Sequence, residues 1–149
     1  MRFTALTKYF DVVGDHHGRP GVPQHEEQNG EYESGILAIG AEVWRVRTAR
    51  VTPKKPGAFV AVWKREEAGE TRPLGSDDGI AGLLVFVQEG ERFGAFRFTA
   101  SQLEIQGVTR SPSHPGKRGF RVYPSWSTNL NPQATRTQAA QSSAFTRLK

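Results

Sequence analysis

The stretch ILAIGAEVWRVRTARV, residues 36–51, predicts a β-hairpin, and the rest of the fold can be worked out from it. An apolar run is followed by a turn at Gly40-Ala41 and by a return strand over 43–51. Side chains alternate between the two faces of a strand. In the return strand this places two apolar residues on one face and two arginines on the other: Trp44, Val46, Arg45 and Arg47. We expect the apolar face to be buried and the arginine face to be exposed.

Further strands are predicted over 58–65, 83–87, 93–99 and 119–123. The strand over 58–65 has apolar residues on both faces, which favours a central, doubly covered strand. It follows a Pro- and Gly-containing loop over 52–57. The runs over 83–87 and 93–99 are close enough in sequence to form a second hairpin.

Three helices are expected between and around these strands. The segment 3–13 has a mixed apolar pattern that fits a helix. Ser101-x-x-Glu104 is a capping box, and Gly107 marks the end of a short helix. Asn131-Pro132 is a strong helix start, and the tail over 133–148 is predicted to be helical.

These elements predict a single α+β domain, with a largely antiparallel or mixed sheet of about six strands and two or three helices. We expect the domain over 31–149. Residues 1–30 form an N-terminal segment and a flexible loop, since 14–30 is rich in Gly, Pro, His and charge.

The composition excludes several classes of protein. The chain has 149 residues and contains no Cys, so it has no disulfides and no thiolate chemistry. It has no apolar stretch of about 18 residues and no signal-peptide pattern, so we expect a cytoplasmic protein without membrane insertion.

The charge is basic and unevenly distributed. The formal net charge is +5 and the pI is about 9.9. Two segments, 43–65 and 108–149, contain no Asp or Glu. Such segments favour a polyanionic partner or an anionic substrate.

The sequence leaves catalysis open. It contains no phosphate-binding glycine motif and no nucleophile elbow. The histidines at 16, 17 and 25 lie in the N-terminal loop without a metal-binding spacing, so we expect no metal and no cofactor. A divergent metal-dependent nuclease is one alternative, built on Lys64 and nearby acids. The candidate acids are Glu33, Glu42, Asp77 and Asp78.

The stretch PGKRGFRVYPSW, residues 115–126, interleaves cations with aromatic residues. Stacking on unpaired bases and neutralising phosphates requires this combination. A strand with Trp126 packed over the sheet edge would have the same pattern.

Four motifs together resemble the MepB family: TPKKPGAFVAVWKR over 52–65, FGAFRF over 93–98, GKRGFRVYPSW over 116–126, and NPQA over 131–134 followed by Thr137-Gln138. The resemblance covers about 32–145 and departs from the family pattern at Ala58 and Ala139. It implies a small protein of bacterial multidrug-efflux gene clusters, where it accompanies a transporter and a MarR-type regulator. It carries over no activity and no catalytic residue.

Our leading hypothesis is a nucleic-acid-binding module with sequence-tolerant, salt-sensitive binding. The predicted contact residues are Arg45, Arg47, Lys54, Lys55, Lys64, Arg65, Lys117, Arg118 and Arg121 for phosphates, and Tyr123 and Trp126 for stacking. The alternatives are the nuclease and a small-ligand-binding accessory protein of efflux, with its site under the two Trp-bearing strands.

Overall fold

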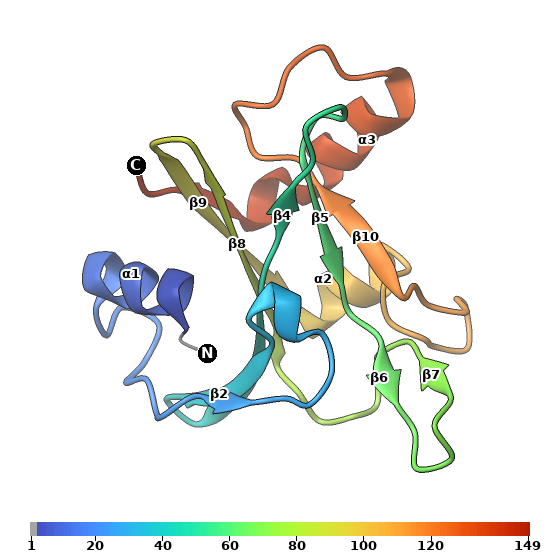
Figure 1. The fold of residues 1–149 in the computed structure, drawn as a ribbon. Coiled ribbons are helices and arrows are strands. Elements are labelled where there is room, and N and C mark those ends of the chain that lie inside the picture. The colour runs from blue at the N-terminus through green and yellow to red at the C-terminus, as the bar shows by residue number, and fades with distance from the viewer. Residues whose placement is uncertain (1–2) are drawn as a thin grey trace.

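A six-stranded mixed sheet forms the centre of the molecule (Figure 1). The structure is a computed structural model that describes residues 3–149. The strands, in spatial order, are β1 (Gln24–His25), β2 (Gly35–Ile39), β3 (Glu42–Thr48), β8 (Gly82–Glu89), β9 (Arg92–Thr99) and β11 (Phe145–Arg147). β3 and β8 are parallel, and the other neighbours are antiparallel. Both predicted hairpins, β2–β3 and β8–β9, are present.

A second, three-stranded sheet lies against the first and is antiparallel throughout. Its order is β10 (Gly119–Val122), β5 (Ala58–Ala61) and β4 (Arg50–Val51). The strand predicted over 58–65 is interrupted after Ala61. It resumes as β6 (Lys64–Arg65), which pairs with β7 (Thr71–Arg72) in a two-stranded ribbon.

Within residues 3–149, three α-helices and two 3-10 helices complete the fold. They are α1 (Thr4–Val13), η1 (Gly30–Tyr32), α2 (Ala100–Ile105), α3 (Pro132–Gln141) and η2 (Ser142–Ala144). The predicted α+β class with a mixed six-stranded sheet is therefore confirmed. No helix within residues 3–149 is long and apolar enough to cross a membrane.

The central sheet buries side chains on both faces, so the molecule has two cores. One core lies between the two sheets, where Val85 and Phe98 pack with Val60 and Phe120. The other lies under α1, which covers the opposite face of the sheet. β8 contributes alternate side chains to both cores, which explains its unbroken apolar run.

The cap of α2 differs from the prediction. Thr99, and not Ser101, is the N-cap: its side chain accepts a hydrogen bond from the Gln102 N–H, and the Gln102 side chain accepts one from the Thr99 N–H. Both pairs fit the capping-box spacing. The earlier pair forms because β9 delivers Thr99 in an extended conformation, which is the backbone that an N-cap requires.

The C-terminal tail also differs. α3 begins after Asn131, as predicted, but ends at Gln141, and the predicted helix over 133–148 is wrong beyond that point. Phe145–Arg147 instead pairs with β9, and the Phe145 ring lies 4.7 Å from that of Phe96. The helical pattern of the tail had a thin apolar face, whereas an added strand partly buries Phe145 and satisfies backbone groups of the sheet edge.

Candidate functional site

Arg45 and Arg47, predicted to be exposed on β3, are buried. Their exposed fractions are 5% and 0%. Arg47 donates to Glu26 at 2.7 Å, and Arg45 donates to Glu26 at 2.9 Å and to Asp78 at 3.0 Å. The prediction of two surface guanidinium groups is therefore wrong. Both arginines lie between the two sheets, and the acids that accompany them come from distant loops.

This buried ion network joins the two sheets. The Arg47 Nε donates to the Ala61 carbonyl on β5 at 3.2 Å. Burial lowers the pKa of Arg47, and the Glu26 carboxylate beside it acts in the opposite direction. A charge at this depth is tolerated because it is both paired and hydrogen-bonded. Arg45 and Arg47 are thus structural cations.

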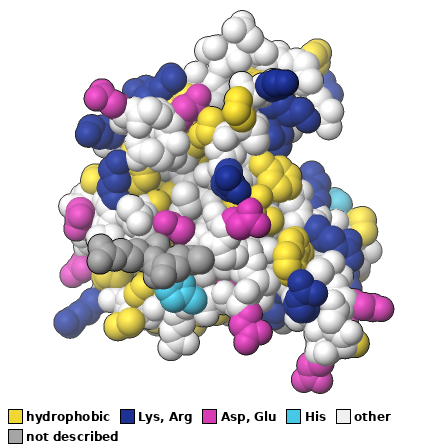
Figure 2. Space-filling model, viewed as in Figure 1, with side chains coloured by type: hydrophobic (Ala, Val, Ile, Leu, Met, Phe, Trp, Pro, Cys, Tyr) yellow, Lys and Arg dark blue, Asp and Glu magenta, His cyan; other side chains and the backbone are white. Residues whose placement is uncertain are grey.

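The exposed cations of the second acid-free segment surround a groove between β10 and α3, which we call the β10–α3 groove. It has a volume of about 510 Å³. No Asp or Glu is found among its lining residues within the described chain. Its cationic and aromatic lining residues are Lys117, Phe120, Arg121, Tyr123 and Arg136. In Figure 2, Lys and Arg side chains lie along the upper right-hand side and also at the upper and lower left, and Asp and Glu lie at the left, centre and lower right.

Neutral amides hold α3 beside β10. The Asn131 side chain caps the helix by accepting from the Ala134 N–H at 2.8 Å. Gln138 donates to the carbonyls of Pro124 and Ser127. Gln141, only 1% exposed, donates to the Arg121 carbonyl and accepts from the Tyr123 N–H. The groove therefore has a fixed wall that does not depend on its cations.

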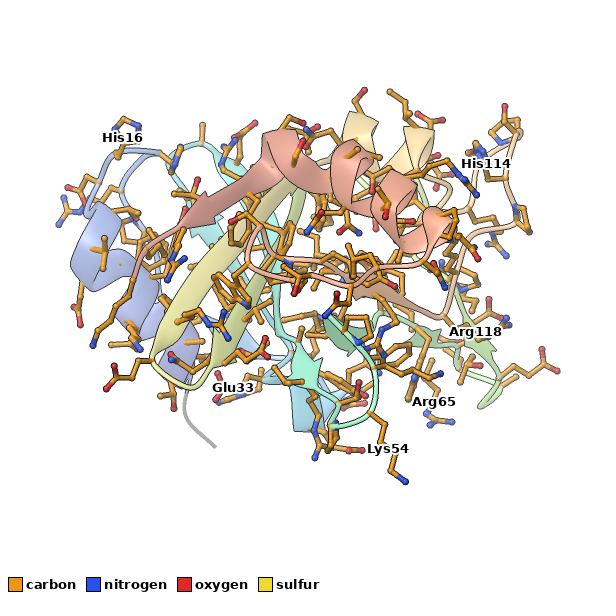
Figure 3. The ribbon with its side chains drawn as sticks, turned by 90° about the horizontal axis from the view of Figure 1, so that it is seen from above. His16, Glu33, Lys54, Arg65, His114 and Arg118 are labelled. Carbon is orange, nitrogen blue, oxygen red and sulfur yellow. The ribbon has the colours of Figure 1, made fainter. Side chains whose placement is uncertain are left out.

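The side chain of Arg121 reaches across to the loop over 52–57. Its Nη2 donates to the Thr52 hydroxyl at 2.7 Å and to the Pro56 carbonyl at 3.0 Å. This contact positions a loop whose two lysines, Lys54 and Lys55, are exposed. In Figure 3, Lys54 points away from the body of the molecule, on the side of β10 opposite α3.

A second, larger groove opens on that side, and we call it the aromatic groove. Its volume is about 940 Å³. Three half-buried rings line it, those of Tyr32, Phe59 and Trp63. The charged residues of the lining are Arg65, Arg118, Glu27, Glu31, Glu66 and Glu67. The expectation that β5 is covered on both faces is thus wrong for its outer face.

Close contacts fix the rings of the aromatic groove. With the Asn29 amide oriented to suit its neighbours, its oxygen accepts from the Trp63 Nε1 at 3.1 Å. The tip of the Phe59 ring lies against β10, where a Cβ at Gly119 would come within 2.4 Å of it. Tyr32 meets Phe59 edge-on, with 6.4 Å between ring centroids.

The remaining predicted residues have separate environments. Trp126 donates to Glu89 at 3.0 Å and lies between Arg92 and Arg147, whose guanidinium carbons are 5.6 and 5.4 Å from its ring. Trp126 is partly buried and packs at the β8–β9 hairpin. Tyr123 is half-buried at the β10–α3 groove. Lys64 makes no ion pair with any residue that the structure describes.

The acids proposed for a nuclease are dispersed. Asp78 pairs with Arg45, Glu33 accepts from Thr48, and Glu42 lies 4.0 Å from Arg97. Within residues 3–149, no three His, Cys, Asp or Glu side chains are grouped to hold a metal ion.

The tryptophans of the two Trp-bearing strands lie in different environments. Trp44 is 1% exposed in the core under α1, whereas Trp63 lines the aromatic groove. The small-ligand alternative stays a prediction.

The fold and these surfaces define a small α+β protein with a basic groove and an aromatic groove on either side of one strand. The chain belongs to the MepB-like family, whose model matches residues 26–147. A solved structure described as the crystal structure of MepB is similar, with 28% sequence identity and a TM-score of 0.84. The match covers 99% of this chain and 97% of that one. No curated protein matches the chain.

Sequence reasoning missed Arg136, Tyr32, Phe59 and Trp63 as candidate site residues. Phe59 and Trp63 did carry a signal, because both large rings fall on the face of the predicted strand over 58–65 that is opposite its valines. Arg136 lies on a helix of low hydrophobicity, where a cation is ordinary. Only the packing of α3 against β10 brings it into a groove.

Proposed function

We propose that this protein binds nucleic acid, and that the β10–α3 groove is the centre of the binding surface. The observation that carries the proposal is a groove with exposed Lys117 and Arg136 in its lining and no lining carboxylate within residues 3–149. A phosphate backbone requires cations that are not already neutralised.

The contact surface differs from the sequence prediction in a definite way. Arg45, Arg47 and Trp126 are left out because they are engaged in the interior or at the β8–β9 hairpin. The contacts that we propose are Lys54, Lys55, Lys64, Arg65, Lys117, Arg118, Arg121 and Arg136 for phosphates, with Tyr123 at the groove.

Binding of this kind is sequence-tolerant, because phosphates carry no sequence information. It is also salt-sensitive, because each neutralised phosphate releases condensed counterions. Affinity for a labelled oligonucleotide should therefore fall steeply as salt is raised.

The test is fluorescence anisotropy with labelled single-stranded and duplex oligonucleotides at two salt concentrations. We expect the double variant Lys117→Ala/Arg136→Ala to weaken binding about tenfold or more at low salt. Its log–log salt slope should be shallower by roughly one unit per lost phosphate contact.

The matched control is Arg19→Ala/Arg147→Ala, which removes the same charge from exposed positions outside both grooves. The proposal is wrong if the two double variants bind alike, or if the wild-type affinity is the same at both salt concentrations. In parallel samples that contain Mg²⁺, the length of the oligonucleotide is measured to detect cleavage. Cleavage that disappears in Lys64→Ala would favour the nuclease alternative.

A further inference from the structure

We infer that the aromatic groove is a base pocket that accepts one unpaired nucleobase of the bound strand and favours guanine. This inference rests on the proposed nucleic-acid binding and adds to it a site and a base preference. It starts from the contents of the groove, which combine stacking rings, free carboxylates and two arginines.

The rings supply a stacking surface that is already positioned. Trp63 is anchored by Asn29 and has the Arg65 guanidinium carbon 5.2 Å from its ring centroid, and the tip of the Phe59 ring rests on the backbone at Gly119. Rings that are fixed before binding lose little conformational entropy when a base stacks on them. Stacking alone is sequence-tolerant, because every base has a π-face.

The carboxylates supply a preference. Of the four glutamates in the lining, Glu31 pairs with Arg50 and Glu66 with Arg72. Glu27 and Glu67 make no ion pair with any described residue, so their oxygens are available as acceptors. An ionised carboxylate only accepts hydrogen bonds, and it accepts two side by side.

Guanine is the base that suits such an acceptor. Its Watson–Crick edge presents two adjacent donors, N1–H and the N2 amino group. The same edge of adenine or cytosine places an acceptor beside the amino group, and that of thymine has one N–H between two carbonyls. Free glutamates in the same groove as stacking rings therefore select guanine among unpaired bases.

The two grooves are close enough in the fold to serve one strand. Lys117 lines the β10–α3 groove, and its sequence neighbour Arg118 lines the aromatic groove. The Arg118 guanidinium is held by the hydroxyl and carbonyl of Thr71, at 3.1 and 2.8 Å. In Figure 3 it lies on the same side of the molecule as Arg65. A backbone that passes Lys117 can thus bring the next base to the rings.

The experiment compares labelled dT20 with the same strand carrying a central dG, dA or dC. We expect the wild-type protein to bind the dG strand several-fold more tightly than dT20. Glu27→Gln/Glu67→Gln should reduce that ratio to about one, and Trp63→Leu should weaken all strands by about tenfold. The salt slope should be the same in wild type and variants, because phosphate contacts are retained.

The matched control is Glu91→Gln/Glu104→Gln, which neutralises two exposed carboxylates outside both grooves and should keep the dG preference. The inference is overturned if the wild-type protein shows no dG preference, or if the preference survives in Glu27→Gln/Glu67→Gln. Free dGMP that binds as tightly as the dG strand would assign the groove to mononucleotides and overturn its link to the strand. If no strand binds at any salt concentration, the proposed function itself has failed.

Discussion

The arginines of β3 and the cations beside the β10–α3 groove come from two acid-free basic segments of the chain, but they have opposite fates in the fold. In the first, 43–65, the central arginines on β3 lie between two sheets and are neutralised by carboxylates. In the second, 108–149, Lys117 and Arg136 stay exposed beside a groove without a carboxylate in its described lining. Equal local charge therefore produced a structural ion network in one place and a free cationic surface in the other.

The difference lies in the partners that tertiary structure brings to each segment. Glu26 and Asp78, which neutralise the arginines of the first segment, are both outside it in sequence. α3 brings only amides and a further cation to the second. A window of sequence without acids thus says nothing by itself about whether its cations are free.

The strongest test of this contrast is Glu26→Ala. It leaves Arg47 buried without its carboxylate, and breaking a buried pair in this way costs about 3–5 kcal/mol. We expect a loss of that size in the free energy of unfolding, measured by urea denaturation. Glu31→Ala, which breaks the exposed pair with Arg50, should cost less than about 1 kcal/mol. Equal losses in the two variants would show that the buried Arg45–Arg47 network contributes no more to stability than an exposed ion pair.

A smaller effect is expected from Gln141→Ala in the second region. The change leaves the Tyr123 N–H and the Arg121 carbonyl without their partner, at a cost of about 1–3 kcal/mol. Thermal unfolding measures the loss, with the exposed Gln133→Ala on the same helix as control. If Gln133→Ala is equally destabilising, helix propensity and not the contact with β10 is responsible.

The helix that covers the apolar face of β3 gives a still smaller, pH-dependent effect. Tyr9 lies on α1, and its burial against the central sheet raises its pKa, against a smaller opposing effect from Arg97. The neutral phenol is therefore favoured in the folded state, so its contribution is complete below the unfolded pKa of about 10 and is lost as pH rises through the folded value. Denaturation curves from pH 9 upward should show a steeper loss for the wild type than for Tyr9→Phe. Parallel curves would contradict the assignment.

The smallest effect is predicted for the cations of the β10–α3 groove. Lys117→Ala/Arg136→Ala should change the free energy of unfolding by less than about 0.5 kcal/mol per substitution, because neither side chain makes an ion pair with the described residues. The same variant is expected to lose nucleic-acid binding, so stability and binding separate in this region. A large loss of stability would mean that these cations have a structural role.

Local signals in the sequence predicted local structure well. Gly40, which adopts a positive φ, marked the first hairpin, and Asn131-Pro132 marked the start of α3. The capping box of α2 lies two residues earlier than predicted. The pairs Thr99–Gln102 and Ser101–Glu104 both have the right spacing, and the end of β9 determines which of them forms the cap.

Features that depend on distant contacts were not predictable in this way. By its local sequence Phe145 fits a helical pattern, and only the tertiary structure supplies β9 as its pairing partner. The exposure of Phe59 and Trp63 depends on where the second sheet ends. The candidate site therefore shares its exposed cations around β10 with the sequence prediction, which did not include the aromatic residues or Arg136.

Because β10 lies between the two grooves, the avidity for a bound strand depends on the length of that strand. A polymer that occupies both grooves is bivalent, and its second contact forms at an effective concentration in the millimolar range, set by the short segment that links the contacts. Avidity then rises sharply once a strand can reach around β10 from Lys117 to Arg118, and it levels off for longer strands. The affinity of the protein would therefore depend on the length of the ligand, although each groove alone binds modestly and no part of the protein has to move.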